Sequence, residues 1–153
     1  MANDNITTVR QFIDELWNNG NFDVIDDYIA PAHVLHDPLT TELRGPDSYE
    51  QHVRALRGAF PDMQFVVEEV FGSGDVVCSR WLVRGTHKGD LFGIAPTNRR
   101  AVLGGATIVH FKAGKIIETW HCWDALSLLQ QVGVIGTLDK LIRAVALPAA
   151  RPH

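Results

Sequence analysis

The sequence predicts a single α+β domain in which helices near the N-terminus are followed by a run of antiparallel strands. Two observations carry this prediction. Apolar residues recur every three or four positions as far as Phe60, the period of a helix, and every second position from Met63 onward, the period of a strand. Short turns join the strand segments, so neighbouring strands are expected to run antiparallel. The 153 residues suffice for one core, and we assign residues 1–153 to one domain.

Three helical segments are expected before the sheet. The first places on one face the apolar residues Ile6, Val9, Ile13, Leu16 and Trp17. A short second helix is expected near residues 22–29, stopped by Pro31, and a short extended piece at residues 34–38. The third helix opens at the turn of residues 44–47, where Pro46 suits a first helical turn, and its apolar stripe is formed by Tyr49, Val53, Leu56 and Phe60.

Four long strands are expected, beginning at Met63, Val76, Val102 and Lys115, with an irregular segment at residues 88–100. A short helix then closes at Gly133, so the core of the domain spans residues 6–133. Residues 134–153 are expected to form a helical extension and a tail. A strongly curved sheet wrapped around helices leaves a cavity at its open end, which is a usual place for a small ligand.

The last hairpin decides which side chains face that cavity. Gly114 suits a three-residue loop at residues 112–114, which places Thr107 opposite Thr119 and Gly105 opposite His121. One face of the hairpin then carries the odd-numbered residues Thr107, Val109, Phe111, Ile117, Thr119, His121 and Trp123. The other carries even-numbered residues such as Ile116, Trp120 and Cys122. A two-residue loop would move His121 to the face opposite Thr107.

Composition excludes several classes of partner and site. The net charge is −4 without a run of Lys or Arg, which argues against nucleic acid. No apolar run is long enough for a membrane span, and residues 1–5 lack the features of a signal peptide, so we expect a cytoplasmic protein. Cys78 and Cys122 are expected to be reduced core thiols, and no Cys/His spacing suits zinc.

Several motifs together resemble one family. Residues 85–97, GTHKGDLFGIAPT, and residues 114–124, GKIIETWHCWD, are similar to two segments of the SnoaL-like polyketide cyclases. Residues 36–38 (HDP), 60–62 (FPD) and 130–133 (QQVG) fit the same family, and the match covers roughly residues 6–133. The resemblance implies a cone-shaped α+β barrel of the ketosteroid-isomerase-like superfamily with a deep apolar pocket. It also implies chemistry with no metal and no organic cofactor.

The resemblance further implies an intramolecular aldol condensation that closes a ring in an aromatic polyketide methyl ester, with an acidic side chain as general acid and base. The position of the family's acid/base Asp is held here by His121, and the position of an assisting His by Thr107. The sequence therefore departs from the family at both places. Asp37 lies where the family has a polar pocket residue, and Trp17 lies where it has an aromatic wall.

Three residues are the catalytic candidates: His121, Asp37 and Asp124. His121 is the expected base, because a histidine can take up a proton near neutral pH. Asp37 is expected to face it across the pocket and orient its ring, as in other base–orienter pairs. Asp124 ends the last strand and either supports His121 or caps the helix that begins at Ala125.

The remaining candidates are expected to bind the substrate: Trp17, His36, Trp81, Thr107, Thr119 and Trp123. The flat rings among them suit a planar polycyclic ligand, although some are expected to be core. His36 and Asp37 are adjacent on an extended segment, so only one of them can point into the cavity. His87 is expected to brace the irregular loop rather than touch the substrate.

The sequence thus favours a cofactor-independent cyclase or isomerase of secondary metabolism, which moves protons on an apolar or aromatic, polyketide-like substrate. One alternative is a hydrolase that activates water with converging charged groups, for which Arg80 and Arg84 are the best-placed arginines. The other is a non-catalytic protein that binds a small ligand. By analogy with the fold, the protein is expected to form a homodimer through the outer face of its sheet.

Overall fold

The computed structural model describes residues 2–136, so the helix expected in the C-terminal extension falls outside the described residues. The N-terminal helix α1 (Ala2–Phe12) continues into a π-helical turn, η1 (Ile13–Asn18). After it come a 3-10 turn, η2 (Phe22–Val24), and the short α2 (Ile25–Tyr28). The longer α3 (Gly45–Ala59) and the short α4 (Ala125–Gln131) complete the helices. The helical periodicity of the N-terminal segments is confirmed.

The strands are β1 (Ile29–His36), β2 (Leu43–Arg44), β3 (Gln64–Ser73), β4 (Val76–Thr86), β5 (Arg100–Lys112) and β6 (Lys115–Trp123). They form one sheet in the order β2-β1-β6-β5-β4-β3. The expected hairpins of β3 to β6 are confirmed. The strand β1 was only partly foreseen: it begins at Ile29 rather than at Val34, and it pairs parallel with β6.

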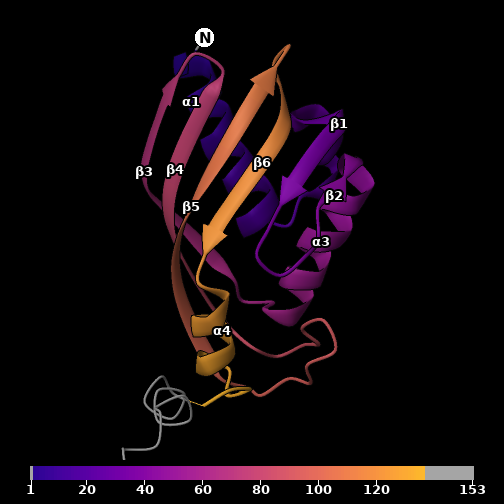
Figure 1. Ribbon diagram of the computed structural model, residues 1–153, viewed down its shortest axis with the longest axis vertical. Coiled ribbons are helices and arrows are strands. Elements are labelled where there is room, and N and C mark those ends of the chain that lie inside the picture. Colours follow the sequence, from indigo (N-terminus) through magenta and orange to yellow (C-terminus); the bar gives the residue numbers. More distant parts are fainter. Residues whose placement is uncertain (1, 137–153) are drawn as a thin grey trace, which may run out of the picture.

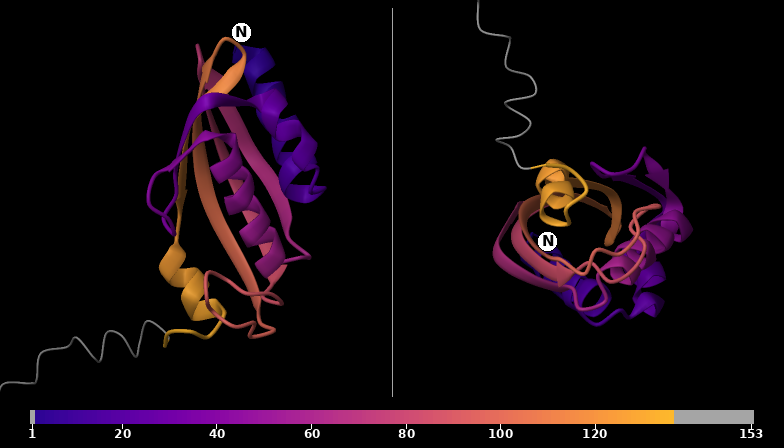
Figure 2. Two further views of the ribbon diagram at one scale, coloured as in Figure 1. Left: turned by 90° about the vertical axis from the view of Figure 1, so that its right-hand side faces the viewer. Right: turned by 90° about the horizontal axis from the view of Figure 1, so that it is seen from below.

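The sheet curls into a cone that is narrow at one end and open at the other (Figures 1 and 2). The helices α1 and α3 lie on its concave side, and α4 lies beside the open end together with the loop between β4 and β5 (Figure 2). A register shift between Val67 and Glu69 in β3 is one source of the curvature, because a bulge increases the local twist of a strand. Fully buried residues such as Leu16, Val53 and Ile116 join helices and sheet in one core.

The β5–β6 hairpin differs from the prediction in its loop length and register. The loop has two residues, Ala113 and Gly114, both with positive φ (50° and 78°), and not the predicted three. A register shift then follows between His110 and Phe111, so that Ile117 is the extra residue of a bulge. The predicted register was therefore wrong, and Thr107 pairs with His121.

The bulge has two consequences for the faces of the hairpin. Because it adds a residue after the shorter loop, Thr107, His121 and Trp123 still share one face, as predicted. Nearer the turn the prediction was wrong, since Ile116, at 1% exposure, faces the core instead of Ile117.

The outer face of the sheet carries both cysteines. They are free, but Cys122 is exposed and Cys78 is half-buried, so the expectation of core thiols was wrong. Side chains along β4 and β6 alternate between the two faces of the sheet, and Cys78 and Cys122 fall on the face away from the helices. Among the described helices, none is long and apolar enough to cross a membrane.

Candidate active site

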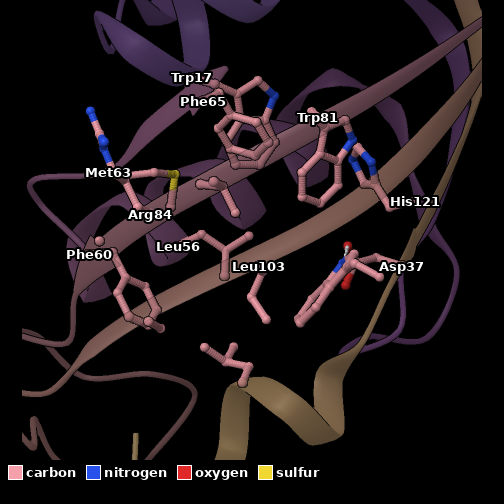
Figure 3. Close-up of a pocket in the computed structure, with 15 residues that line it drawn as sticks. Trp17, Asp37, Leu56, Phe60, Met63, Phe65, Trp81, Arg84, Leu103 and His121 are labelled. Carbon is pink, nitrogen blue, oxygen red and sulfur yellow. Dashed lines mark hydrogen bonds between the residues drawn. The ribbon is translucent and has the colours of Figure 1, made fainter. Parts of the chain in front are cut away.

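The open end of the cone holds a cavity with an almost wholly apolar lining (Figure 3). Its empty space is about 610 Å³, including the mouth that opens to solvent. Helices and strands both contribute to its walls. The apolar and aromatic lining residues include Trp17, Leu56, Phe60, Phe65, Trp81, Leu103, Trp123 and Leu128. Two ionisable side chains of this lining are shielded from solvent, Asp37 and His121, and Figure 3 shows them on the same side of the cavity.

Asp37 follows the end of β1 and is held by three groups. Its Oδ1 accepts a hydrogen bond from the backbone N–H of Leu39 at 2.9 Å, and its Oδ2 accepts one from Trp123 Nε1 at 3.2 Å. His52 Nε2 lies 3.6 Å from the same Oδ2. Burial raises the pKa of Asp37, but His52 and the Leu39 N–H outweigh it and hold the pKa below its ordinary value. The carboxyl group is therefore ionised at neutral pH.

His121 lies on β6, directly opposite Thr107 of β5. Its Nδ1 is 2.9 Å from Thr107 Oγ1, and Trp81 Nε1 donates a hydrogen bond of 2.8 Å to the same oxygen. Among the described residues, its Nε2 is buried without a hydrogen-bond partner. Burial lowers the pKa of His121 to about 4, since Asp37 only partly offsets the desolvation and His52 adds to it. The imidazole is therefore neutral at pH 7.

Four rings separate this cavity from a smaller one deeper in the cone. The ring centroids lie 5.2 Å apart for Trp17 and Phe65, 5.0 Å for Phe65 and Trp81, and 6.2 Å for Trp17 and His121. All four side chains line both cavities. The π-helical turn that carries Trp17 is a feature often found at functional sites.

The position of Trp81 depends on Gly105. The two residues are paired across β4 and β5, and the indole lies over the bare backbone of the glycine. A Cβ atom at Gly105 would be 2.5 Å from Trp81 Cη2, which is closer than real Cβ contacts. The absence of a side chain at residue 105 thus allows Trp81 to reach Thr107.

The structure brings together most of the predicted site residues. Asp37, His121, Trp17, Trp81 and Trp123 line the outer cavity. Thr107 and Thr119 line the inner cavity instead, and Thr119 Oγ1 lies 2.9 Å from His33 Nε2. The expected Asp37–His121 orienting pair is replaced, because the ring of His121 takes its hydrogen bond from the Thr107 side.

Two of the candidates lie outside the cavity lining. His36 points to the outer face, where its ring stacks on Trp120 at 3.6 Å and its Nε2 is 2.9 Å from Glu118 Oε1. It points away because it alternates with Asp37, the neighbour that does enter the cavity. Asp124 is exposed and caps α4, since its Oδ1 accepts from the Ser127 N–H at 2.8 Å. The capping alternative is confirmed, and neither residue is retained as a site candidate.

Sequence reasoning missed His52 and Gly105. His52 lies three residues after Tyr49 and four before Leu56, so helical spacing would have placed it on the buried face of α3. Nothing in the sequence marks Gly105, because its importance depends on a partner strand. The expected bracing role of His87 is supported: its Nδ1 is 3.0 Å from Thr97 Oγ1, and its ring is buried away from the cavity.

Within residues 2–136, no group of three His, Cys, Asp or Glu side chains is arranged to hold a metal ion. The donor set at the cavity consists of one carboxylate and one imidazole, which suits proton transfer rather than metal binding.

Comparison with known proteins agrees with the fold and the cavity. The family model of the SnoaL-like polyketide cyclases matches residues 7–132. The chain is 32% identical over 131 residues to the aklanonic acid methyl ester cyclase of Streptomyces galilaeus, covering 84% of this chain and 90% of that protein. It is 29% identical over 121 residues to the nogalonic acid methyl ester cyclase of Streptomyces nogalater, covering 76% and 89%.

A solved structure from Jannaschia sp. CCS1, named as a SnoaL-like polyketide cyclase, superposes with a TM-score of 0.82 at 23% identity. The superposition covers 88% of this chain and 95% of that chain, and it shows a shared fold. Taken with the match of the family model over residues 7–132, these findings establish that the chain belongs to the SnoaL-like polyketide cyclase family.

Proposed function

We propose that this protein is a cofactor-independent cyclase that closes a ring in an aromatic polyketide ester by proton transfer. The observation that carries the proposal is the presence of an ionised Asp37 and a neutral His121 in the wall of an otherwise largely apolar cavity. An ionised carboxylate can accept a proton and a neutral imidazole can donate a hydrogen bond, and Figure 3 places the two side chains on the same side of the cavity. The low polarity of the walls strengthens every interaction that these two groups make with a developing charge.

The proposed reaction is an intramolecular aldol condensation. A proton leaves the carbon next to a carbonyl group, and the electron pair of that C–H bond moves onto the carbonyl oxygen as an enolate. The enolate carbon forms a C–C bond with a second carbonyl carbon of the same molecule, whose oxygen takes a proton in turn. The mass of the substrate is unchanged, so the cavity has to supply only a base and a hydrogen-bond donor.

The walls suit a planar, fused-ring substrate. The indoles of Trp17 and Trp81 and the ring of Phe65 present flat surfaces on which aromatic rings pack with favourable geometry. The curated relatives are named for methyl esters of aklanonic and nogalonic acid. We therefore propose an aromatic polyketide methyl ester of secondary metabolism as the class of substrate.

The hydrolase alternative has little support in the structure. Arg80 lies on the outer face, where it pairs with Glu68 and Glu69. The guanidinium group of Arg84 bonds Gln64 Oε1 at 2.8 Å and 3.1 Å, and Figure 3 places Arg84 across the cavity from Asp37. These arginines do not converge with Asp37 on one point where a water could be activated.

The test is incubation of the protein with aklanonic and nogalonic acid methyl esters without added cofactor, followed by chromatography and mass spectrometry. A product of unchanged mass and new retention time is expected. Asp37→Asn, which keeps an acceptor for the Leu39 N–H, is expected to lower kcat/KM by about 10²–10⁴-fold. The matched control is His36→Asn, one residue away on the outer face, and it should retain activity.

Other outcomes of this experiment separate the alternatives. A free acid lighter by ~14 mass units, the balance of one water gained and one methanol released, would indicate ester hydrolysis and would contradict proton-transfer cyclisation. Tight binding of both esters without turnover would indicate a binding protein. Equal activity of Asp37→Asn and the wild type would remove Asp37 from the chemistry.

We also propose that a second copy of the chain covers the outer face of the sheet. That face exposes large apolar side chains, among them Val66 (49%), Val102 (51%) and Trp120 (43%). Apolar residues gathered on one sheet face favour association. Light scattering after size exclusion should give twice the 17.0 kDa of one chain, and a monomer at micromolar concentration would contradict the proposal.

A further inference from the structure

A short row of polar side chains crosses the inner face of the sheet behind the cavity. Ser79 of β4 pairs with Thr107 of β5, and Thr107 pairs with His121 of β6. The hydroxyl group of Thr107 is buried between two ring nitrogens, Trp81 Nε1 at 2.8 Å and His121 Nδ1 at 2.9 Å. The side chains of Trp81, Thr107 and His121 thus form one chain of hydrogen bonds. Which group donates in each bond can be worked out by counting protons.

The indole nitrogen of Trp81 can only donate, so it occupies a lone pair of Thr107 Oγ1. If His121 also donated from Nδ1, the hydroxyl proton of Thr107 would need a different acceptor. Ser79 Oγ lies opposite but has no hydrogen-bond partner among the described residues, so it is not that acceptor. A buried donor left unmet costs about 1–3 kcal/mol.

In the reverse arrangement Trp81 donates to Thr107 and Thr107 donates to Nδ1 of His121, and one buried group is left unmet, the Nε2–H. A donating Nδ1 would leave two, the hydroxyl proton of Thr107 and the lone pair of Nε2, so the reverse arrangement is favoured. A neutral imidazole carries one proton, so an accepting Nδ1 leaves the proton on Nε2. That nitrogen is buried without a partner within residues 2–136, on the edge of the ring away from Thr107. His121 lines the cavity, so an oxygen of a bound ligand would satisfy this nitrogen once the side chains that cover it move aside.

We propose that Trp81 and Thr107 are positioning residues that hold His121 as the Nε2–H tautomer, so that His121 donates a hydrogen bond to the substrate and Asp37 acts as the base. The proposal rests on the proposed function and assigns a role to each of its two groups. It reverses the expectation from the sequence, in which His121 was the base.

The assignment balances the proposed reaction. Asp37 takes the proton of the C–H bond that breaks, and the enolate oxygen accepts the hydrogen bond from His121 Nε2–H. After the C–C bond forms, the protonated Asp37 returns its proton to the oxygen of the second carbonyl group. His121 stays neutral throughout, which suits a preorganised donor aimed at a developing negative charge.

The tautomer can be measured without any substrate. Long-range ¹H–¹⁵N spectra of the uniformly ¹⁵N-labelled protein at pH 7 distinguish a protonated from an unprotonated ring nitrogen, and His121→Gln identifies the signals. We expect an unprotonated Nδ1 and a protonated Nε2. A protonated Nδ1 in the wild type would overturn the proposal.

Variants of the two positioning residues test their roles. Thr107→Val removes the hydroxyl at nearly constant volume, and Trp81→Phe removes the indole N–H; each is expected to give a mixture of tautomers. Thr107→Ser, which retains the hydroxyl, should restore the Nε2–H form. The matched control is Thr119→Val, whose hydroxyl contacts His33, and it should leave the His121 signals in place. A single Nε2–H tautomer in a folded Thr107→Val would refute the role of Thr107.

Turnover of aklanonic acid methyl ester gives a second readout. Loss of the aligned donor in Thr107→Val should lower kcat by roughly tenfold to 10²-fold and change KM little, because the bond strengthens only as the enolate forms. If the wild type does not turn over the ester but shows the Nε2–H tautomer, the proposed function fails and the positioning stands. If turnover occurs with a protonated Nδ1, the function stands and the positioning fails.

Discussion

His36 and His121 belong to neighbouring strands, and their surroundings are opposite. His36 lies on the outer face, with its ring stacked on Trp120 and its Nε2 beside Glu118. His121 lies on the inner face, where a hydroxyl and aromatic rings surround it and burial lowers its pKa to about 4. His36 therefore contacts side chains on the outer face of the sheet, whereas His121 is a neutral group in the wall of an apolar cavity.

The pleat of the sheet, and not the residue type, therefore decides which of these side chains faces the cavity. His36 and Asp37 alternate along one extended segment, so the inward position belongs to Asp37. In β6 the bulge at Ile117 adds the residue that returns His121 to the inner face. Insertion or deletion of one residue in either segment would move the inward-facing side chain to the outer face.

The largest expected effect concerns stability at low pH. The pKa values of His121 and His33 are about 4 in the folded protein and ~6.5 when unfolded, so acid favours the unfolded chain. The free energy of unfolding has its full value above pH 6.5 and falls as the pH drops towards 4. The loss is about 3 kcal/mol for His121 alone. The lowered pKa of Asp37 also contributes to the free energy of unfolding, but that contribution is lost only below pH 3.8, outside this window.

Urea unfolding at pH 7.0, 5.5 and 4.5 measures this loss. The variant His121→Gln cannot titrate, so its free energy of unfolding should vary less steeply between pH 6.5 and 4 than that of the wild type. His33→Gln should flatten the curve in the same way. An unchanged slope in His121→Gln would mean that its surroundings resemble those of the outer face.

A smaller effect is expected from the two adjacent glycines of β5. Gly105→Ala should lower stability by about 1–3 kcal/mol, because the new Cβ displaces the indole of Trp81. Gly104→Ala points to the outer face, where the nearest atom is 3.9 Å away, and should change stability by less than about 0.5 kcal/mol. Thermal unfolding of the two variants checks the contrast, and equal destabilisation would contradict the packing described for Trp81.

The smallest effect is expected on the outer face. His36→Ala removes the stacking on Trp120 and the contact with Glu118, and should cost about 1 kcal/mol or less. Turnover should stay within about twofold of the wild type, since a surface change far from the reacting atoms has little influence on the barrier. A loss of activity as large as that of Asp37→Asn would bring His36 back into the site.

Much of the fold was predictable because local periodicity encodes it. The helical spacing of Val9, Leu16 and Val53 and the alternation in β3 to β6 were sufficient to place most elements. The motifs of residues 85–97 and 114–124 pointed to the family that the comparisons establish. Asp37, His121 and Trp17 could be singled out as candidates on the same basis, and all three line the cavity.

The failures have a common cause in contacts between distant segments. The parallel pairing of β1 with β6 joins residues more than eighty positions apart, and no local pattern announces it. The bulge at Ile117 was missed because the turn at residues 113–114 can be fitted by two loop lengths with different registers. The contact of His52 with Asp37 requires α3 to pack against the end of β1.

The α+β class, the order of most elements and the family can be read from the amino-acid sequence, since they follow from periodicity and from contiguous motifs. The charge states and hydrogen bonds of the cavity residues, in contrast, depend on contacts between distant segments. Burial of His121 lowers its pKa to about 4, donors around Asp37 keep that carboxylate ionised, and the Thr107 hydroxyl lies between Trp81 and His121. Charge state and proton position depend on solvent exclusion and hydrogen bonding, which exist only once the strands are side by side.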